Sequence, residues 1–537
     1  MNKKTWLWVM VIFISVMFGL IVGNLLAFRS SNSSGAVSLP RILRIENNKI
    51  GEMLGLINKS YVDTIDMRTL AEGLVVDLAS SLDPHSVYIP AKNLADVNSD
   101  LEGTFSGVGI EFNIQQDTVM IVSVFSGGPS EKVGLMAGDR IIAVNNSNFT
   151  GKTINNERVV KNLRGKKGTQ VKLTVRRNGT REKLNFSVTR GDIPVNSIVA
   201  SYIIAPEIGF IRVDKFGART YSEFLNALAT LYNQGANKFI IDLRENTGGF
   251  MEAAIDMANE FLPRGQMIVY AKGRSYPYFE ARSDGKGTCI DFPLAVLIDD
   301  FSASASEIFA GAMQDNDRAL IIGRRSFGKG LVQQQFELSD KSAFRMTVAR
   351  YYTPSGRCIQ KSYTRGKSSD YDHELMDRYR HGEFYNADSV KINDSLKYKT
   401  IGGRIVYGGG GIMPDIFVPR DTTQYTSFLN KAMNLSYLYQ FAFKYTDENR
   451  KSMAQYKSWQ ELKKYLDKQP LLIQFANFTA SKNLKASPSE LNISKNLIIN
   501  TLQAYIVRNM LGDSGFYPVF YLDDKVVKKA ITEIQKK

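Results

Sequence analysis

Histidine and cysteine are scarce in this chain, which limits the chemistry that it can carry. Its 537 residues include three histidines, His85, His373 and His381, and two cysteines, Cys289 and Cys358. The histidines lie far apart and no H-E-x-x-H sequence occurs, so the ligand spacing of a zinc enzyme is missing. We therefore expect neither a metal nor a cofactor. Whether the cysteines pair stays open, because an oxidising compartment would permit a disulfide that the sequence alone does not show.

Long runs of one charge are absent as well. The formal net charge is +15, but lysine and arginine are interspersed with acidic residues in most segments. This pattern argues against a nucleic-acid partner, and no zinc-finger spacing supports one. A hydrophobic fraction of 44% and a charged fraction of 23% are typical of globular protein, and 537 residues are too many for one core. We expect several domains.

One apolar run is long enough to cross a bilayer. It extends from Trp6 to Phe28, with two lysines before it and Arg29 after it. The lysines predict that the short N-terminal end lies in the cytoplasm. Because no clean A-x-A cleavage site follows, we interpret residues 1–28 as an uncleaved single-pass anchor in the inner membrane, with the folded part in the periplasm. The alternative is a signal peptide whose cleavage releases the chain into the periplasm.

Changes in composition and in hydrophobic periodicity divide the chain after residue 28 into segments. Residues 29–39 are rich in serine, asparagine and glycine, which is typical of a flexible linker. Residues 40–102 have apolar side chains at helical spacing, which predicts an N-terminal helical region. Residues 103–190 change to short strands and glycine turns around one helical stretch, so we expect a small β-rich module there.

Strands and helices alternate over residues 191–421, which predicts an α/β layered domain. A polar stretch at about residues 361–402 has the composition of an insertion into this domain. Residues 422–537 have helical periodicity and no chemical motif, so we interpret them as a helical extension for packing or partner binding.

A serine cluster stands between a predicted buried strand and a predicted helix. The segment Phe301-Ser-Ala-Ser-Ala-Ser-Glu-Ile308 directly follows the apolar run FPLAVLI. A hydroxyl at such a turn is exposed, and the amides of the helix N-terminus can stabilise a developing oxyanion. Ser304 is therefore a candidate nucleophile. The alternative is that the serines of this cluster only cap the helix.

A nucleophilic serine needs a base, and the histidines lie in an N-terminal turn and in the polar insertion. Lys329, in Ser326-Phe-Gly-Lys-Gly330, follows the predicted strand ALIIG and has a glycine on each side. A buried lysine has a lowered pKa and can accept the serine proton. Gln333, four residues further, can orient the amine.

Two familiar sequence motifs overlap this lysine, but other residues that each motif requires are missing from the chain. Gly323 to Gly330 nearly matches a phosphate-binding P-loop, but Gly330 replaces the hydroxyl residue that would hold magnesium. Ser326-x-x-Lys329 matches a motif of penicillin-binding enzymes, but neither S-D-N nor K-T-G occurs, and the flanking glycines disfavour the required helix.

Several motifs, taken in order, resemble those of the carboxyl-terminal processing proteases, a Ser/Lys peptidase family that includes the tail-specific proteases. They are Ser81–Ser86, Gly107–Ile110, Gly138–Ile141, Asp242–Gly249, Ser302–Ile308, Phe327–Gly330 and Tyr352–Arg357. The resemblance implies an α/β multidomain fold. It has a crotonase-like α/β protease core at residues 191–421, a PDZ domain before it at residues 103–190, a helical N-terminal lead-in and a helical C-terminal domain.

The resemblance also implies roles for residues. It makes Ser304 the nucleophile, Lys329 the general base and Gln333 the residue that orients the base. It places the oxyanion hole at the main-chain amides of Gly249, chosen over its neighbouring glycine, and of Ala305. Asp242 and Arg244 could be taken for a further catalytic element, but we expect them to be structural and to close a turn behind the oxyanion loop.

In the PDZ domain, the resemblance implies a groove that holds the C-terminus of a peptide. One wall presents main-chain N–H groups and an edge strand, and the other is a helix. The expected peptide-binding residues are Gly107, Val108, Gly109, Ile110, Val159 and Leu163. The alternatives are a rigid spacer, or a module that gates the active site.

Together these features predict a serine-type endopeptidase that cleaves protein substrates near their C-termini in the cell envelope through an acyl-enzyme. The expected partners are proteins with accessible C-termini, an adaptor protein, the membrane through the anchor, and further copies of the chain in a homo-oligomer. A non-catalytic PDZ scaffold of the envelope is the alternative function.

Overall fold

The computed structural model describes residues 41–536, except residues 116, 126 and 392. The predicted anchor and linker lie outside the described residues. In the part that is described, no helix is both long and apolar enough to span a membrane.

The chain separates into two compact units, Met1–Asp77 and Leu78–Lys537. In the first unit, the helix predicted from apolar spacing is present as α2 (Arg41–Ser60), and α3 (Met67–Ser80) begins there and extends past the boundary. Apolar side chains of α2 such as Ile50 are exposed.

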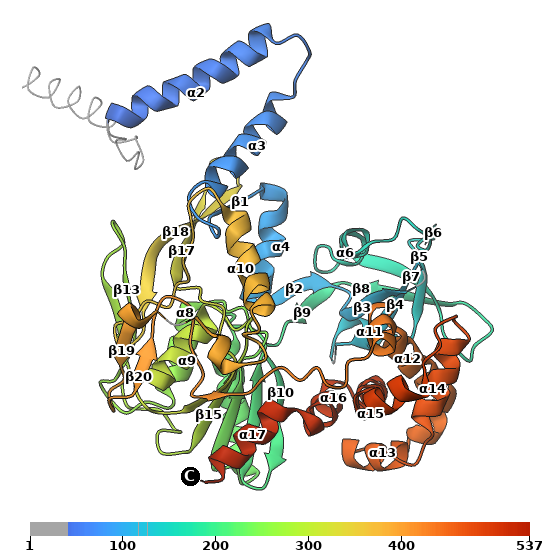
Figure 1. The fold of residues 1–537 in the computed structure, drawn as a ribbon. Helices are drawn as coiled ribbons and strands as arrows, with labels where there is room; N and C mark the ends of the chain where they lie inside the picture. Colours follow the sequence, from blue (N-terminus) through green and yellow to red (C-terminus); the bar gives the residue numbers. More distant parts are fainter. Residues whose placement is uncertain (1–40, 116, 126, 392, 537) are drawn as a thin grey trace, which may run out of the picture. The chain divides into compact units, whose positions relative to one another are not determined.

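In the second unit, an antiparallel sheet forms the β-rich module (Figure 1). Its strands are β3 (Ile110–Gln115), β4 (Thr118–Val124), β5 (Arg140–Val144), β6 (Ser147–Asn148), β7 (Gln170–Arg176) and β8 (Leu184–Thr189). The order is β3-β4-β5-β7-β8, with β6 on β5, so β3 is an edge strand among the described strands. Alternate side chains of β7 are buried, which is the period-2 pattern that predicted the strand. Two short helices, α5 (Pro129–Lys132) and α6 (Asn156–Leu163), complete the module.

A mostly parallel sheet forms the α/β core. Its order is β10-β11-β12-β15-β16-β21, and β10 alone is antiparallel to its neighbour. The bounds are β10 (Ile198–Ala205), β11 (Ile208–Val213), β12 (Lys238–Asp242), β15 (Leu294–Ile298), β16 (Leu320–Gly323) and β21 (Ile416–Phe417). Every residue of β11 and β15 is buried, which explains their continuous apolar sequences.

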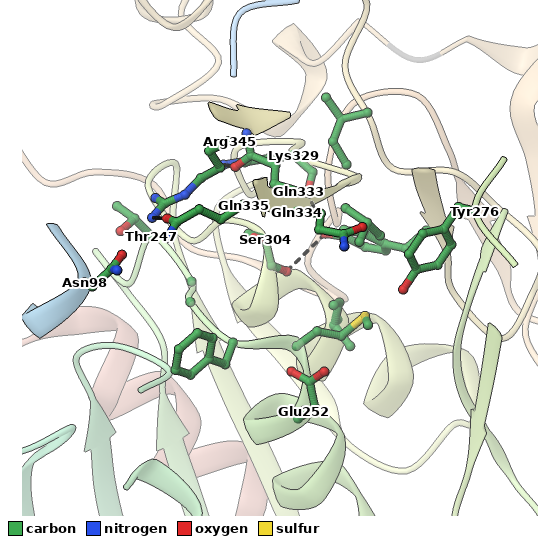
Figure 2. A pocket seen from close by; sticks show the side chains of 18 of the residues that line it. Asn98, Thr247, Glu252, Tyr276, Ser304, Lys329, Gln333, Gln334, Gln335 and Arg345 are labelled. Atoms are coloured by element: carbon green, nitrogen blue, oxygen red, sulfur yellow. Dashed lines mark hydrogen bonds between the residues drawn. The ribbon is translucent and has the colours of Figure 1, made fainter. Parts of the chain in front are cut away.

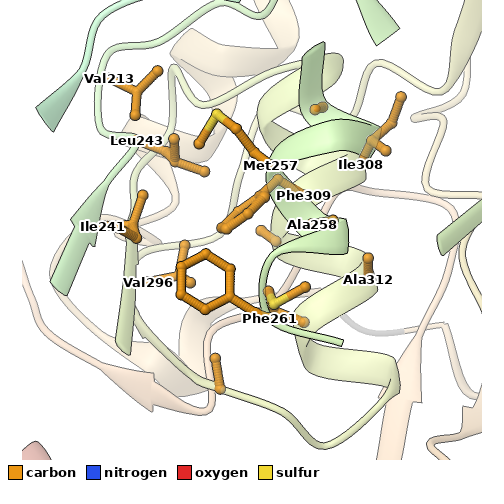
Figure 3. Close-up of a cluster of buried hydrophobic side chains, with 14 of the residues drawn as sticks. Val213, Ile241, Leu243, Met257, Ala258, Phe261, Val296, Ile308, Phe309 and Ala312 are labelled. Carbon is orange, nitrogen blue, oxygen red and sulfur yellow. The ribbon is translucent and has the colours of Figure 1, made fainter. Parts of the chain in front are cut away.

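Helices cover both faces of this sheet. One face packs against α7 (Thr220–Asn233), α8 (Met251–Asn259) and α9 (Ala305–Asp315), and Figure 3 shows aromatic and aliphatic side chains filling this layer. The other face packs against α17 (Lys525–Ile534) through Val526, Val527 and Ala530.

A second sheet lies beside the active-site loops and includes a strand that the sequence did not predict. It contains β1 (Val87–Ile89), β18 (Ala343–Tyr352), β13 (Met267–Lys272) and β14 (Phe279–Arg282), with β17 (Leu331–Glu337) also on β18. Residues 40–102 were expected to be helical, and α4 (Ala91–Glu102) fits, but β1 interrupts them. A three-residue strand is too short to show a period and forms because β18 supplies its partner.

The polar insertion and the C-terminal region are ordered into further elements. The insertion contains α10 (Ser368–Arg380), η1 (Ala387–Ser389), η2 (Asp394–Leu396) and a hairpin of β19 (Lys397–Lys399) and β20 (Ile405–Tyr407). The C-terminal helices are α11 (Ser427–Asn434), α12 (Tyr437–Met453), α13 (Trp459–Leu466), α14 (Leu471–Ala480), α15 (Pro488–Leu511) and α16 (Asp513–Phe520), followed by η3 (Tyr521–Asp523) and α17. A short antiparallel pair, β2 (Thr104–Gly107) and β9 (Gly191–Pro194), connects the β-rich module to the core. The two cysteines, Cys289 and Cys358, are both free thiols.

Candidate active site

Loops from three neighbouring parallel strands meet at one edge of the core sheet. β12, β15 and β16 pair in parallel register, so their carboxyl ends point the same way. Gly249 follows the first, Ser304 the second and Lys329 the third. They line a cavity of about 730 Å³, and Figure 2 shows the side chains of Ser304, Lys329 and Gln333 gathered in it.

Ser304 occupies the sharp turn between β15 and α9. Its φ of 56° and ψ of −115° are unfavourable for a residue with a side chain, and such strain persists only where the surroundings impose it. Ser302 and Ser306 are fully buried and donate to the main-chain oxygens of Leu243 and Asn246, at 2.8 and 2.9 Å. The flanking serines therefore hold the neighbouring loop, while Ser304 faces the cavity.

The Lys329 amine is oriented by Gln333. Nζ donates to Gln333 Oε1 at 3.2 Å. Burial lowers the pKa of Lys329 below its usual range, and the charge of Arg345 lowers it further, while Glu307 and Asp83 act in the opposite direction. No hydrogen bond joins Nζ to the Ser304 hydroxyl in the part of the chain that the structure describes, so the two groups have to come within hydrogen-bond reach before the proton is transferred.

Glu307 ties the two halves of the dyad together, and the sequence analysis gave it no role. Its buried carboxylate accepts from the main-chain N–H groups of Ser304 (2.9 Å), Gly328 (2.8 Å) and Lys329 (2.8 Å), and from the Ser326 hydroxyl (2.5 Å). Burial raises the pKa of Glu307, and these donors oppose that effect. The carboxylate thus fixes the main chain at both Ser304 and Lys329.

Tyr351 makes a second link that sequence reasoning missed. Its hydroxyl lies within hydrogen-bond distance of the main-chain oxygens of Ser304 (3.0 Å) and Lys329 (2.5 Å). The glutamate could have been found from its place in the serine motif, whereas no local pattern marks this tyrosine.

Two main-chain amides beside Ser304 have no acceptor among the described residues. Gly248 N–H donates to Asn246 Oδ1 at 2.8 Å, but the N–H groups of Gly249 and Ala305 donate to nothing within the described residues. A Cβ on Gly248 would lie 2.7 Å from Ser304 Cβ and one on Gly249 2.0 Å from Phe216 O, so this close approach requires glycine. These contacts favour Gly249 over Gly248 as an oxyanion donor.

Asp242 and Arg244 lie directly behind this loop. Arg244 Nε and Nη2 donate to the Asp242 carboxylate at 2.9 and 2.8 Å, and Arg212 adds a contact at 3.2 Å. Burial alone would raise the pKa of Asp242, but the two arginines hold it below its usual range. Both residues are buried and away from the cavity lining, as a structural role requires.

In the β-rich module, the predicted peptide-binding residues fall into two groups. The N–H groups of Val108 and Gly109, in the Gly107–Ile110 segment, donate to no acceptor in the described chain, so they are available to a carboxylate. Val159 and Leu163 are buried in the module's own core, at 0% and 4% exposure. Their contact with a peptide stays a prediction.

Three regions of the chain match models of known protein families. A model of peptidase family S41 matches residues 207–372, a PDZ domain model matches residues 106–188, and a family of unknown function, DUF8443, matches residues 428–512. The chain is 33% identical over 356 residues to the carboxy-terminal processing protease CtpB of Bacillus subtilis strain 168, which covers 65% of this chain and 71% of that protein. The chain belongs to peptidase family S41.

Other relatives of this S41 peptidase have matching names. A carboxy-terminal-processing protease of Bartonella bacilliformis is 36% identical over 318 residues, covering 58% of this chain and 72% of that one. The solved photosystem II D1 C-terminal processing protease is 29% identical with a TM-score of 0.34, over 58% of this chain and 84% of that one. The two domain models and the two sequence relatives confirm the family, the multidomain fold with its PDZ domain, and the serine peptidase class.

Proposed function

We propose that this S41 peptidase cleaves protein substrates near their C-termini, with Ser304 as nucleophile, Lys329 as general base and Gln333 as its orienting residue. The observation that carries the proposal is a single cavity lined by the strained serine, the lysine with its lowered pKa and Gly249, whose N–H, like that of Ala305 next to the serine, has no acceptor among the described residues.

The reaction begins when a substrate carbonyl oxygen accepts from the N–H groups of Gly249 and Ala305. The neutral Lys329 amine takes the Ser304 proton as Oγ bonds to the carbonyl carbon, and the resulting oxyanion is stabilised by the amides. The lysine then gives its proton to the leaving amine, which frees the C-terminal fragment and leaves an acyl-enzyme. Water, deprotonated by the same amine, hydrolyses the ester.

The first test replaces the dyad. Lys329→Ala should slow hydrolysis of an unstructured polypeptide by roughly 10²–10⁴-fold, the contribution of a positioned base, and Ser304→Ala should slow it at least as much. Fragment release is followed by mass spectrometry, which also shows whether C-terminal fragments are removed. Variants as fast as the parent would refute the dyad, and tight peptide binding without turnover in the parent would support the non-catalytic scaffold instead.

The PDZ domain is proposed to hold the substrate carboxylate at Val108 and Gly109. Gly109 has a φ of +79° and a Cβ there would lie 2.8 Å from Ile193 Cδ1, so Gly109→Ala should distort the loop and weaken binding of a peptide with a free carboxylate. Gly179→Ala is the control, because that glycine has a φ of +82° and open space around it. Equal peptide affinities of the two variants by calorimetry would count against this site.

The cell-envelope location is proposed from the apolar run in residues 1–28 alone. The membrane anchor, an adaptor protein and a homo-oligomer stay predictions from the sequence, and cell fractionation of the tagged full chain would test the first.

A further inference from the structure

Residues of the polar insertion contact the loop of the base, since Lys361 N–H donates to Gly328 O at 2.9 Å and Arg378 to Ser326 O at 3.0 Å, and a buried tyrosine of the insertion contacts the turn that contains His85. Tyr371, on α10, is 3% exposed, and its hydroxyl lies 2.9 Å from His85 Nε2. The two rings pack edge to face with centroids 5.0 Å apart. Neither the insertion nor the turn that contains His85 has a part in the mechanism above.

That turn holds the far side of Gln333. While Gln333 Oε1 accepts from the Lys329 amine, Gln333 Nε2 donates to the main-chain oxygen of His85 at 2.5 Å. Asp83 fixes the turn, because its carboxylate accepts from the N–H groups of His85 (2.8 Å) and Ser86 (2.9 Å) and from the Ser86 hydroxyl (2.6 Å). The amide that orients the base is therefore itself held by an element that precedes the PDZ domain.

A second path leads from Tyr371 back to the loop of the base. Gln360 Nε2 donates to the Tyr371 hydroxyl at 3.4 Å, and Gln360 Oε1 accepts from the N–H of Gly330, the residue after Lys329, at 2.8 Å. A chain of contacts thus connects the Lys329 amine, through Gln333, His85, Tyr371 and Gln360, to the main-chain N–H of Gly330.

The charge state of His85 suits this chain of contacts. Burial lowers the pKa of His85 to about 4, and the charges of Lys329 and Lys361 contribute, against an opposing effect of Asp83. The ring is therefore neutral at pH 7, and its Nε2 can accept the phenolic O–H while that oxygen accepts from Gln360.

We propose that Tyr371 is a positioning residue for the general base. Through His85 it holds Gln333, and through Gln360 it holds the main chain at Gly330, so that the Lys329 amine keeps the orientation that proton transfer requires. The inference rests on the proposed function, since Tyr371 acts only through Lys329.

The test removes one oxygen atom. Tyr371→Phe keeps the ring contacts with His85 and Phe327 and deletes the hydroxyl. We expect kcat on an unstructured polypeptide to fall roughly ten-fold, part of the ~10²–10⁴-fold that a positioned base supplies, with KM within about two-fold of the parent. Tyr363→Phe is the control: its ring contacts Tyr371 at 6.4 Å, but its hydroxyl makes no hydrogen bond within the described chain.

A double-mutant cycle separates positioning from general loosening of the fold. If Tyr371 acts through Gln333, Tyr371→Phe should lower kcat less than about two-fold in a Gln333→Ala background. The same ten-fold loss in both backgrounds, a rise in KM of similar size, or a value of kcat equal to that of Tyr363→Phe would overturn the inference. Should Tyr371→Phe unfold at the assay temperature, His85→Phe, which cannot accept the phenolic proton, enters the same cycle.

Failure of this inference is distinguishable from failure of the proposed function. A parent enzyme that hydrolyses the polypeptide, with Ser304→Ala inactive and Tyr371→Phe unchanged, would refute the positioning role alone. A Ser304→Ala variant as active as the parent would refute both.

Discussion

Lys329 shares the active-site cavity with a second cation, Arg345. The guanidinium donates to Gln335 Oε1 at 2.9 Å, and no carboxylate pairs with it in the described chain. A neighbouring positive charge disfavours the ammonium form of lysine, which is why Arg345 adds to the effect of burial on the pKa of Lys329. The neutral amine that accepts a proton is thereby present over a wider pH range.

Removing this charge should change the pH dependence of hydrolysis. In Arg345→Gln the pKa of Lys329 rises, so the neutral fraction at a given pH falls and the acid limb of the kcat/KM profile moves to higher pH. Arg350→Gln, on the same strand but exposed, is the control and should leave the limb in place. The measurement is the kcat/KM profile of each variant between about pH 6 and 10. An acid limb of Arg345→Gln that stays in place or moves to lower pH would contradict the role of Arg345.

Motifs predicted the reacting residues because each lies in a short contiguous pattern, and they missed the residues that support them. Ser304, Lys329 and Gln333 are brought together as expected. In the sequence, Tyr351 is 22 positions from Lys329, and Tyr371 is 286 positions from His85. Such contacts depend on the fold, and a single sequence contains no local signal for them.

At the scale of elements, Asp524 both caps α17 and joins this helix to the core through an ion pair. Asp524 precedes the helix and accepts from Val527 N–H at 2.9 Å, and it also pairs with Arg244 Nη1 at 2.7 Å. The helix cap thus contacts the arginine that lies behind the oxyanion loop, and beside it Arg212 Nη1 donates to the Tyr521 hydroxyl at 2.7 Å.

Substitution can separate these two tasks. Asp524→Asn keeps the cap and loses the ion pair, whereas Asp524→Ala loses both. A lost cap costs about 0.5–2 kcal/mol, so the alanine variant should be destabilised by roughly that much more than the asparagine variant. Urea unfolding measures the difference, and equal stabilities of the two variants would show that the cap contributes nothing.

Long apolar runs made most core strands predictable, while short strands were not. β11 and β15 are buried on both faces and were expected from sequence alone. β1, β2 and the β19–β20 hairpin have three or four residues per strand, too few to show an alternation, and they exist because a partner strand is nearby.

At the scale of the whole molecule, the C-terminal helices contact both the PDZ domain and the protease core. Arg508 on α15 pairs with Glu111 on β3 at 2.8 Å, and Arg450 on α12 donates to the main-chain oxygen of Ala137 at 3.2 Å. α17 covers one face of the core sheet, from Phe210 to Ile322. The region that matches a family of unknown function, residues 428–512, thus contacts the PDZ domain, while α17, which follows it, contacts the core sheet.

A charge placed under α17 should unfold the core. Val527 is 1% exposed, and Val527→Asp puts an unpaired carboxylate against the sheet, which costs on the order of 3–5 kcal/mol. Thr532→Asp, at an exposed position of the same helix, should change stability little. The free energy of unfolding in urea is the measurement, and similar values for both variants would mean that α17 does not stabilise the sheet.

The cover that α17 gives the sheet has a consequence for biosynthesis. The strands it protects begin at residue 198, yet the helix ends at residue 534, so more than half of the chain must be synthesised between them. Non-local pairing of this kind delays folding and leaves apolar surface exposed in the meantime. We therefore expect that a nascent chain has no assembled protease core until its C-terminal helices leave the ribosome or translocon, which would keep a ribosome-bound peptidase from acting on its neighbours.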